Sequence, residues 1–451
     1  MKDGVLDKTL EKFSASFTEN AKGKSVQVIT HFDTDGITSG AIFTQAMKRL
    51  DQKFSLKIIK GLNKEIIDSL NKERITVFID LASGSLEEIE KSGIKKVYII
   101  DHHEIDEEKI PGNVEIINPQ LSSKQKISSS GLTYLFAKKI DERNKDLAKL
   151  GVLGMIGDQM GKDIEELNHG ILEDGEIQRK RGLTIYPSTR PLNRVLEFSS
   201  NPFIPGVTGN PKGVIELLRE SNLAPEGGKY KNLIDLTEVE MENLVTSIIL
   251  RNPEKKHKEL IGDLFLIKMF GKLEDARELS AKINACSREG HSEVALGFCL
   301  ENFNYKKKAE SIHTKYKQQL ISGIKFAQSE EKINGKGYVI LNAKDKIKDT
   351  MIGTISSIIA NSPNYEKGTV IIGMGYDGEK IKVSGRNVGR NGRNLRELLT
   401  NVMKAFNGEV GGHHEAAGCV IDIKDEEEFI ERIKRELELE VVRVANPNEN
   451  L

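Results

Sequence analysis

Residues 25–36 read SVQVITHFDTDG, and this stretch decides how the first part of the chain is interpreted. Its apolar, β-branched start, 25–30, predicts a buried strand. The polar cluster HFDTDG (31–36) follows directly, and a helical pattern continues over 38–50. A strand, a polar turn and a helix in this order predict one unit of a parallel α/β sheet.

The same order of elements recurs along the first 160 residues. Short apolar runs with helical stretches between most of them predict the remaining strands of the sheet. The predicted strands cover residues 25–30, 55–59, 75–80, 96–101 and 114–118. At three of them, acids or histidines stand at the carboxyl end, which is the edge where ligands bind in open α/β sheets.

Four polar clusters follow apolar runs in this part of the chain. They are the pair Asp33 and Asp35, the single acid Asp80, the run Asp101-His102-His103, and Asp158 after Gly157. A helix cap, a calcium-type loop or a polar loop explains each of them alone. Together they predict a metal site, and oxygen and nitrogen ligands without thiolates favour Mn²⁺ or Mg²⁺ over structural zinc. Their number suits two ions about 3.5–4 Å apart for displacement at phosphorus.

The composition excludes several classes of protein. Lys and Arg number 67 against 68 Asp and Glu, so the net charge is −1 and the chain is not a globally basic nucleic-acid binder. No run approaches the roughly 18 apolar residues of a membrane span, and the start lacks the apolar core of a signal peptide. The three cysteines form no CxxC pair. We expect a cytoplasmic protein with no membrane segment.

The length of 451 residues predicts more than one domain. Prolines gather between Pro187 and Pro225, which predicts an ordered but irregular insertion, with helices near 236–251 and 273–288 after it. The Lys-rich stretch 305–329 predicts one long helix. The expected divisions are a parallel α/β domain over 1–165, an insertion and helical extension over 166–302, a linker helix over 303–332, a smaller α/β domain over 333–440 and a tail over 441–451.

The last of these domains carries two candidate substrate-binding motifs. A hairpin over 369–376 and 380–386, with Asp377-Gly378 as its turn, leads into a basic, glycine-rich loop. That loop holds Arg386, Arg390, Arg393 and Arg396, and arginine suits bidentate contacts to phosphate. The glycine-rich run GGHHEAAG (411–418) lies downstream.

These motifs, in this order, resemble the signatures of the DHH superfamily of phosphoesterases. HFDTDG, the strand-ending Asp80, the DHH run at 101–103 and Asp158, with SSSG (128–131) ahead of it, match the catalytic signatures. GGHHEAAG is similar to the GGGHxxAAG motif of the DHH-associated domain, with Val410 where the first glycine usually stands. NACSR (284–288) resembles the NAAGR motif of RecJ-type members, from which Cys286 and Ser287 depart.

The resemblance implies a fold and a set of roles. The fold is α/β: a parallel-sheet DHH metal domain joined by a long helix to a smaller α/β DHH-associated domain. Asp80 would bridge two ions as a catalytic residue, and His103 would face the scissile phosphate as a charge stabiliser or proton donor. The implied metal ligands are His31, Asp33, Asp35, Asp80, His102 and Asp158. The implied substrate-binding residues are Asn284, Arg288, Ser384, Arg386, Gly411, Gly412 and His413.

The likeness to archaeal RecJ-like proteins implies a single-strand exonuclease that uses two Mn²⁺ ions, with Mg²⁺ as the alternative metal. DNA and RNA stay open as substrates, as do both polarities of digestion. The implied setting is replication or repair, with the GINS replication complex as a partner. The alternatives are a nanoRNase, a cyclic-dinucleotide phosphodiesterase, an inorganic pyrophosphatase and a replication-fork scaffold. The NAAGR-like motif and the long middle segment disfavour the first three, and the full ligand set disfavours a purely structural role.

Overall fold

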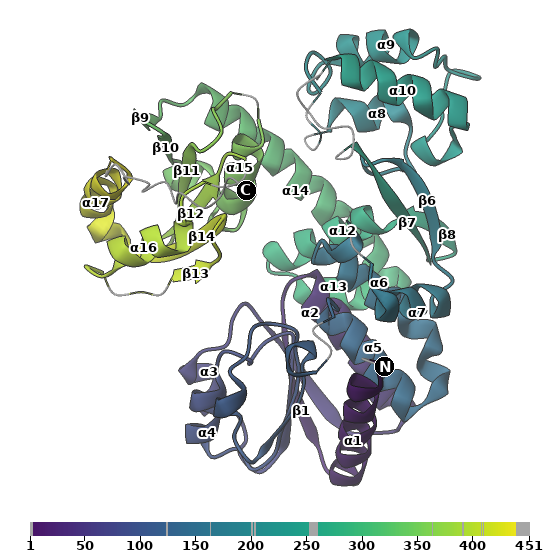
Figure 1. Ribbon diagram of the computed structural model, residues 1–451, viewed down its shortest axis with the longest axis vertical. Coiled ribbons are helices and arrows are strands. Elements are labelled where there is room, and N and C mark those ends of the chain that lie inside the picture. The colour runs from purple at the N-terminus through teal and green to yellow at the C-terminus, as the bar shows by residue number, and fades with distance from the viewer. Residues whose placement is uncertain are drawn as a thin grey trace, which may run out of the picture. The chain divides into compact units, whose positions relative to one another are not determined.

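Two compact units make up the chain, Met1–Thr314 and Lys315–Leu451, and each has its own sheet and its own hydrophobic core (Figure 1). This computed structural model describes residues 3–122, 125–162, 164–199, 202, 204–251, 260–362, 364–389, 392–406, 408 and 410–438.

The first unit is built on a five-stranded sheet in the order β2-β1-β3-β4-β5, in which every pairing is parallel. The strands are β1 (Val26–His31), β2 (Phe54–Ile59), β3 (Ile75–Ile79), β4 (Val97–Ile100) and β5 (Val114–Ile117). The predicted parallel α/β class is therefore confirmed. Because neighbouring parallel strands end together, the carboxyl ends of β1, β3 and β4 meet at one edge of the sheet.

Helices cover both faces of this sheet, because successive strand side chains point to opposite sides. Val77 and Ile79 pack on one side and Phe78 on the other. The first face is covered by α1 (Asp3–Ala21), α2 (Thr34–Arg49), α5 (Ser129–Ile140) and α6 (Ala148–Gly157), and the second by α3 (Lys64–Asp68) and α4 (Leu86–Ser92) (Figure 1). Helix α2 begins four residues before the expected position, because Asp33 caps it.

The middle of the chain holds more regular structure than its composition suggests. A second, antiparallel sheet in the order β6-β7-β8 was not expected. The proline-rich insertion also contains two helices that share a separate core with a third, so the expectation of an irregular segment was wrong. The elements are α7 (Glu166–Asp174), β6 (Gln178–Leu183), α8 (Leu192–Glu197), α9 (Pro211–Glu220), α10 (Glu238–Arg251), β7 (Ile261–Met269) and β8 (Lys272–Asp275).

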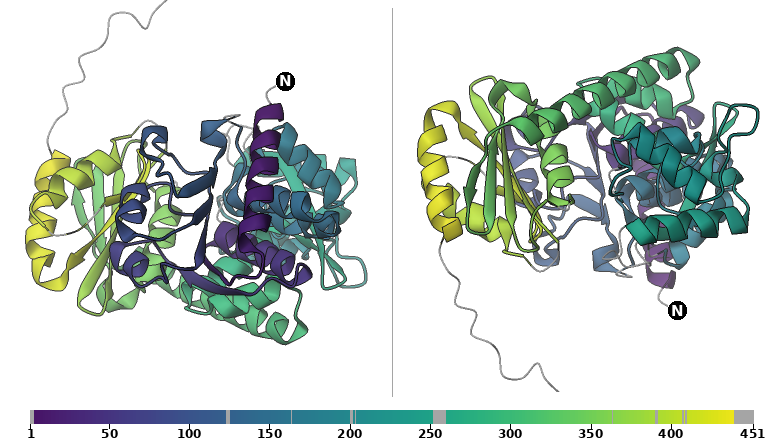
Figure 2. Two further views of the ribbon diagram at one scale, coloured as in Figure 1. Left: turned by 90° about the horizontal axis from the view of Figure 1, so that it is seen from below. Right: turned by 90° about the horizontal axis from the view of Figure 1, so that it is seen from above.

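Three helices complete the first unit and lead out of it: α12 (Ala276–Arg288), α13 (Ser292–Cys299) and α14 (Phe303–Ser329). The helix expected over 273–288 thus begins later, because residues 272–275 pair with β7. Leu279 of α12 and Val294 of α13 lie in the same core as the parallel sheet, so α12 packs directly against the sheet domain. The long helix expected over 305–329 is confirmed, and α14 runs for 27 residues without interruption (Figure 2).

The second unit is a six-stranded sheet in the order β13-β14-β12-β11-β10-β9, antiparallel except for the pair β10 and β11. Helix α15 packs on one face, and α16 and α17 share a core with the other. The predicted hairpin is present, with Gly378 in the left-handed region at its turn. The elements are β9 (Ile333–Gly335), β10 (Tyr338–Asn342), α15 (Asp349–Ala360), β11 (Val370–Asp377), β12 (Lys380–Asn387), α16 (Leu395–Met403), β13 (Val410–Gly412), β14 (Ala416–Asp422) and α17 (Glu426–Glu438).

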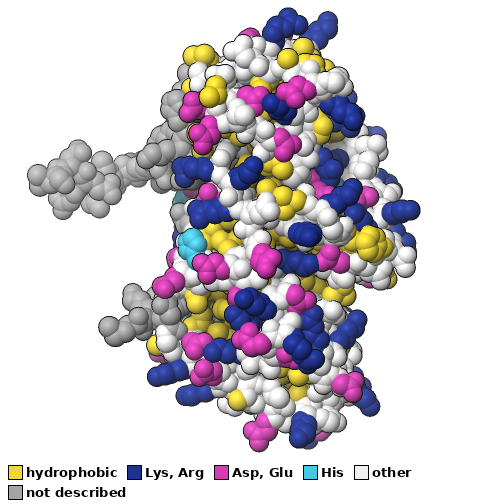
Figure 3. All heavy atoms as spheres, turned by 90° about the vertical axis from the view of Figure 1, so that its right-hand side faces the viewer, with side chains coloured by type: hydrophobic (Ala, Val, Ile, Leu, Met, Phe, Trp, Pro, Cys, Tyr) yellow, Lys and Arg dark blue, Asp and Glu magenta, His cyan; other side chains and the backbone are white. Residues whose placement is uncertain are grey.

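Basic and acidic side chains are interspersed on the face drawn in Figure 3, in keeping with the near-zero net charge. Among the residues that the structure describes, no helix is both long and apolar enough to span a bilayer.

Candidate metal centre

The turn after β1 presents its two carboxylates in different ways. Asp33 caps α2, and its Oδ1 accepts a hydrogen bond from the backbone N–H of Gly36 at 3.0 Å. Its Oδ2 lies 3.1 Å from Nδ1 of His31. A side chain at Gly36 would collide with the backbone of His31, since an added Cβ would lie 2.3 Å from the carbonyl oxygen. The glycine therefore lets the turn fold back on the strand.

Asp35, in contrast, is completely buried and is held by the N-terminus of another helix. Its Oδ2 accepts from the N–H of Ser129 at 2.7 Å and its Oδ1 from that of Ser130 at 3.0 Å. The first N–H groups of α5 have no partner within their helix and favour a negative charge. An added Cβ on Gly154 would lie 2.3 Å from Oδ1 of Asp35, so α6 approaches only because this residue is glycine. The SSSG motif thus fixes the orientation of Asp35.

Asp80 follows β3 in a left-handed backbone conformation with φ of 62°. Its side chain is buried, and neither carboxylate oxygen has a hydrogen-bond donor within the described part of the chain. Oδ2 lies 3.4 Å from Nδ1 of His31, and Oδ1 lies 3.6 Å from Nε2 of His102. A buried carboxylate without donors is costly to fold, and so is a strained backbone. Both features fit a residue whose partners are cations.

The loop after β4 is organised by Asp101, a buried residue that sequence analysis left out of the site. Its Oδ1 accepts from the N–H of His102 at 2.8 Å and lies 2.7 Å from Nδ1 of His103. Its Oδ2 accepts from the N–H of Ser83 at 3.1 Å. The ring of His103 is thereby held at Nδ1 while the side chain stays half exposed. The signal was present in the sequence, because Asp101 opens the DHH run.

The last predicted ligand, Asp158, caps the carboxyl end of α6. Its Oδ2 lies 3.2 Å from Nε2 of His102, which also lies 3.9 Å from Oδ2 of Asp35. The structure therefore brings all six predicted ligands together, although they come from four separate parts of the chain. One group of possible metal ligands joins Asp80 and His102 with His103. The six predicted ligands themselves form two further groups, each with ligand atoms within 4.8 Å of one another: His31, Asp33 and Asp80, and Asp35, His102 and Asp158. Asp80 faces both groups, one oxygen to each.

The charges in the cluster are not balanced without a cation. Burial lowers the pKa of His31, but Asp33 and Asp80 outweigh it and raise that pKa to about 10. Burial also lowers the pKa of His102, and its carboxylate neighbours raise it to about 11. Burial, together with nearby carboxylates, raises the pKa of Asp35. The cluster must therefore take up protons, whereas divalent cations would balance the same carboxylates with both histidines neutral.

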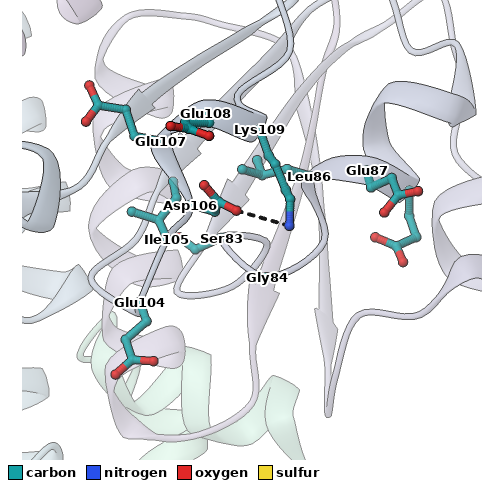
Figure 4. Close-up of a pocket in the computed structure, with 11 residues that line it drawn as sticks. Ser83, Gly84, Leu86, Glu87, Glu104, Ile105, Asp106, Glu107, Glu108 and Lys109 are labelled. Carbon is teal, nitrogen blue, oxygen red and sulfur yellow. Dashed lines mark ion pairs between the residues drawn. The ribbon is translucent and has the colours of Figure 1, made fainter.

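An acidic pocket of about 700 Å³ lies beside this centre, and Figure 4 shows it. It begins at Ser83, which binds Asp101, and continues along the loop after His103. Its one lysine, Lys109, pairs with Asp106 at 3.0 Å. The lining acids are Glu87, Glu88, Glu104, Asp106, Glu107 and Glu108. Their charge repels phosphate, so this pocket is unsuited to a nucleic-acid backbone.

The predicted substrate-binding residues lie in both units. In the first unit, Arg288 is in the last turn of α12, and Oδ1 of Asn284 on the same helix accepts from the N–H of Thr34 at 3.1 Å. In the second unit, Nε of Arg386 donates to Oγ of Ser357 at 2.8 Å. Ser384 is buried on the same strand.

The glycine-rich motif of the second unit lies on its sheet edge. Ser384 of β12 is in register with Gly418 of β14, which in turn pairs with Gly411 of β13. Gly412 has a φ of 114°, and an added Cβ there would collide with Ala416. The N–H of His413 donates to the carbonyl of Ala416. Ser384 on β12 and the pair Gly411 and Gly412 on β13 therefore lie on the two strands that flank β14, and His413 directly follows β13, while Arg390 lies outside the described residues.

Three family models match the chain. The DHH family N-terminal domain matches residues 25–155, the DHH-CID domain 186–259 and the DHHA1 domain 335–439. Uncharacterized protein MJ0831 of Methanocaldococcus jannaschii is 30% identical over 427 residues, which cover 90% of this chain and 92% of that protein.

Solved structures share the fold along nearly the whole chain. RecJ of Thermus thermophilus in complex with Mn²⁺ has a TM-score of 0.59 at 18% identity, covering 96% of this chain and 56% of that one. An exonuclease RecJ bound to manganese has a TM-score of 0.61 at 16% identity, covering 96% and 95%. CDC45 from Entamoeba histolytica has a TM-score of 0.66 at 12% identity, covering 95% and 99%. This chain thus spans little more than half of the Thermus protein.

We predict that Mn²⁺ raises the thermal unfolding temperature of the protein and that Asp80→Asn abolishes this rise. The substitution is isosteric but removes the charge that faces both groups of ligands. Binding at a hundredfold excess over Kd stabilises by about 2.7 kcal/mol, which is easily measured by thermal melting. Asp68→Asn, an exposed acid of α3, serves as the control. A full rise in Asp80→Asn would contradict the placing of the metal.

Proposed function

The chain belongs to the DHH superfamily as a RecJ-like member, and from that premise we propose that it is a Mn²⁺-dependent exonuclease of single-stranded DNA or RNA, with Mg²⁺ as the alternative metal. It would release mononucleotides by hydrolysing phosphodiester bonds. The observation that carries the proposal is Asp80, a buried carboxylate without donors that faces two groups of metal ligands. Such an arrangement suits a pair of ions bridged by one acid.

Two divalent ions bound there would supply a hydroxide from water and neutralise charge on the attacked phosphate. His31, Asp33 and Asp80 would hold one ion, and Asp35, His102 and Asp158 the other, with Asp80 shared. The chain's own part is to keep these ligands in place. The N-terminus of α5 prevents Asp35 from rotating, and the turn at Gly36 keeps Asp33 against His31.

His103 is suited to proton transfer because one of its ring nitrogens is already engaged. Asp101 lies 2.7 Å from Nδ1, so Nε2 is the remaining polar atom of the ring. The hydrogen bond to Asp101 raises the pKa of His103 and favours the protonated ring. In that form His103 can stabilise charge on the phosphate or donate a proton from Nε2 to the leaving oxygen.

The second unit would bind the single-stranded nucleic acid. The proposed contacts to phosphates or to the terminal nucleotide come from Ser384, Arg386, Gly411, Gly412 and His413. The sequence predicts further substrate contacts from Asn284 and Arg288 of α12. Glycines on an edge strand let a backbone approach closely. Several phosphate contacts would favour a strand over a dinucleotide and would make binding sensitive to salt.

A nanoRNase, a cyclic-dinucleotide phosphodiesterase and a replication-fork scaffold with residual activity are the alternatives. The resemblance to archaeal RecJ-like proteins is the reason that the proposal includes a role in replication, with the GINS complex as partner. Retention of the chain on immobilised GINS complex tests that partnership, and its absence from the bound fraction removes it.

The exonuclease proposal is tested on single strands of DNA and RNA labelled at one end or the other. We expect release of mononucleotides with Mn²⁺, slower release with Mg²⁺ and none in EDTA. The labelled end that is lost first gives the polarity. Asp80→Asn is the control for a contaminating nuclease. Undiminished cleavage in EDTA, or a preference for dinucleotides over longer strands, would exclude the proposal.

Arg386→Ala should weaken the grip on long strands without affecting the metal chemistry. An arginine–phosphate contact contributes about 1.5–3 kcal/mol, so KM for a long strand should rise about tenfold or more. KM for a dinucleotide should change little. Ser357→Ala is the matched control, because it removes only the hydroxyl that Nε of Arg386 contacts. Equal effects of the two variants would show that Arg386 acts in packing α15 on the sheet and not on substrate.

Asp101→Asn should shift the pH dependence of kcat. The carboxylate raises the pKa of His103, so the neutral amide lowers it. If protonated His103 is required, activity on the alkaline side should fall at lower pH in the variant than in the wild type. Asp106→Asn removes an exposed charge from the same loop and is the control. An unchanged alkaline limb would exclude proton donation by His103.

A further inference from the structure

We infer that Asn284 is a positioning residue of the metal centre: α12 holds Thr34, the residue between the two acids of the DxD turn, and so sets where those acids point. This inference rests on the proposed function only in naming the centre as a site for divalent metal. It differs from the expectation that Asn284 contacts substrate.

The contacts join residues that are 246 and 250 positions apart in the sequence. The N–H of Thr34 donates to Oδ1 of Asn284 at 3.1 Å. Its hydroxyl donates to the carbonyl of Ser280 at 3.1 Å and lies the same distance from the hydroxyl of Ser280. One turn of α12 therefore engages both polar groups with which Thr34 can donate, and Thr34 is almost fully buried.

The hydrogen bond to Asn284 supplies an acceptor that the first residue of α2 would otherwise lack. The first N–H groups of a helix have no acceptor within it. Asp33 accepts from Gly36, but a capping side chain does not reach the first residue, Thr34. Asn284 supplies that acceptor from a distant helix. Thr34 also packs against α6, since an added Cβ on Gly157 would lie 2.7 Å from its Cβ. The turn is thus held on two sides.

Helix α12 is itself anchored at its other end. Asp275 caps it by accepting from the N–H of Arg277 at 2.9 Å, and its second oxygen accepts from the N–H of Ser188 at 2.9 Å. Arg190 donates to Glu278 of the same helix at 3.2 Å. The segment that begins the DHH-CID match therefore fixes the first turn of α12, and the DxD turn contacts the helix further along, at Ser280 and Asn284.

The contact also determines which way the carboxamide faces. Because the N–H of Thr34 is a donor, the oxygen of Asn284 must point at it. An aspartate at this position would keep an acceptor oxygen toward Thr34. It would lose the amide donor and add a negative charge, both of which are unfavourable for a phosphate contact. Asn284→Asp and Asn284→Ala therefore separate a positioning role from a substrate contact.

The experiment measures Mn²⁺ affinity from the metal-induced rise in unfolding temperature, and KM and kcat on a single strand. Loss of a residue that orients metal ligands typically costs about 10–100-fold in metal affinity. We expect Asn284→Ala to weaken Mn²⁺ binding about tenfold or more, with kcat at subsaturating Mn²⁺ reduced and KM for the strand little changed. Asn284→Asp should restore Mn²⁺ affinity to near the wild-type value. Asn304→Ala, an exposed asparagine of α14, is the matched control.

The opposite pattern would overturn the inference. A raised KM with unchanged Mn²⁺ affinity in Asn284→Ala, and an Asn284→Asp variant at least as impaired, would identify a substrate contact. If Asn284→Ala does not fold, Asn284→Asp alone decides, because the positioning role requires it to bind Mn²⁺ normally. The metal readout needs no nuclease activity, so a chain that binds Mn²⁺ but cleaves no strand would contradict the proposed function and leave this inference standing.

Discussion

The arrangement of the first unit depends on one constraint, which is the repulsion among its buried carboxylates. Asp35, Asp80 and Asp158 lie around His102, and burial together with neighbouring carboxylates raises the pKa of Asp35 and of Asp158. Such a cluster is stable only if positive charge enters it, as protons on the histidines or as divalent cations. The fold contributes part of that charge through the N-terminus of α5, which holds Asp35. Among the described residues, Asp80 receives no backbone donor. Burial raises its pKa, but the neighbouring rings of His102 and His31 outweigh burial and lower that pKa, so this carboxylate depends on positive charge at both of its oxygens.

The parallel sheet brings these carboxylates together at one edge, and two glycines let the surrounding backbone approach them closely. The strands β1, β3 and β4 end at the same edge, so the residues that follow them converge there. Gly36 and Gly154 then allow the turn and helix α6 to approach to distances that any side chain would block.

Sequence patterns predicted the residues at this sheet edge well, because each predicted ligand follows an apolar run. The same run therefore predicts both the buried element and the position of the site. They predicted the middle of the chain poorly. Strand β6 reads QRKRGL and shows no apolar alternation, while the apolar run of β7 suits a strand and a buried helix equally. Asp101 belongs to the DHH run, but the run alone does not show that its carboxylate orients His103. The contact between Thr34 and Asn284 spans most of the first unit, and no local pattern reports such a pairing.

The predicted metal ligands and the predicted substrate-binding motif of the DHH-associated domain lie in different units. The six predicted ligands, together with Asn284 and Asp101, all belong to Met1–Thr314, so one unit contains the whole predicted ligand set. The glycine-rich motif with Ser384 and Arg386 belongs to the other. The predicted metal ligands and the proposed strand-binding residues therefore lie in units with separate hydrophobic cores. In the first unit, by contrast, α12 joins the inserted segment to the DxD turn by direct contacts, so ligand geometry there depends on residues far from the metal edge in sequence.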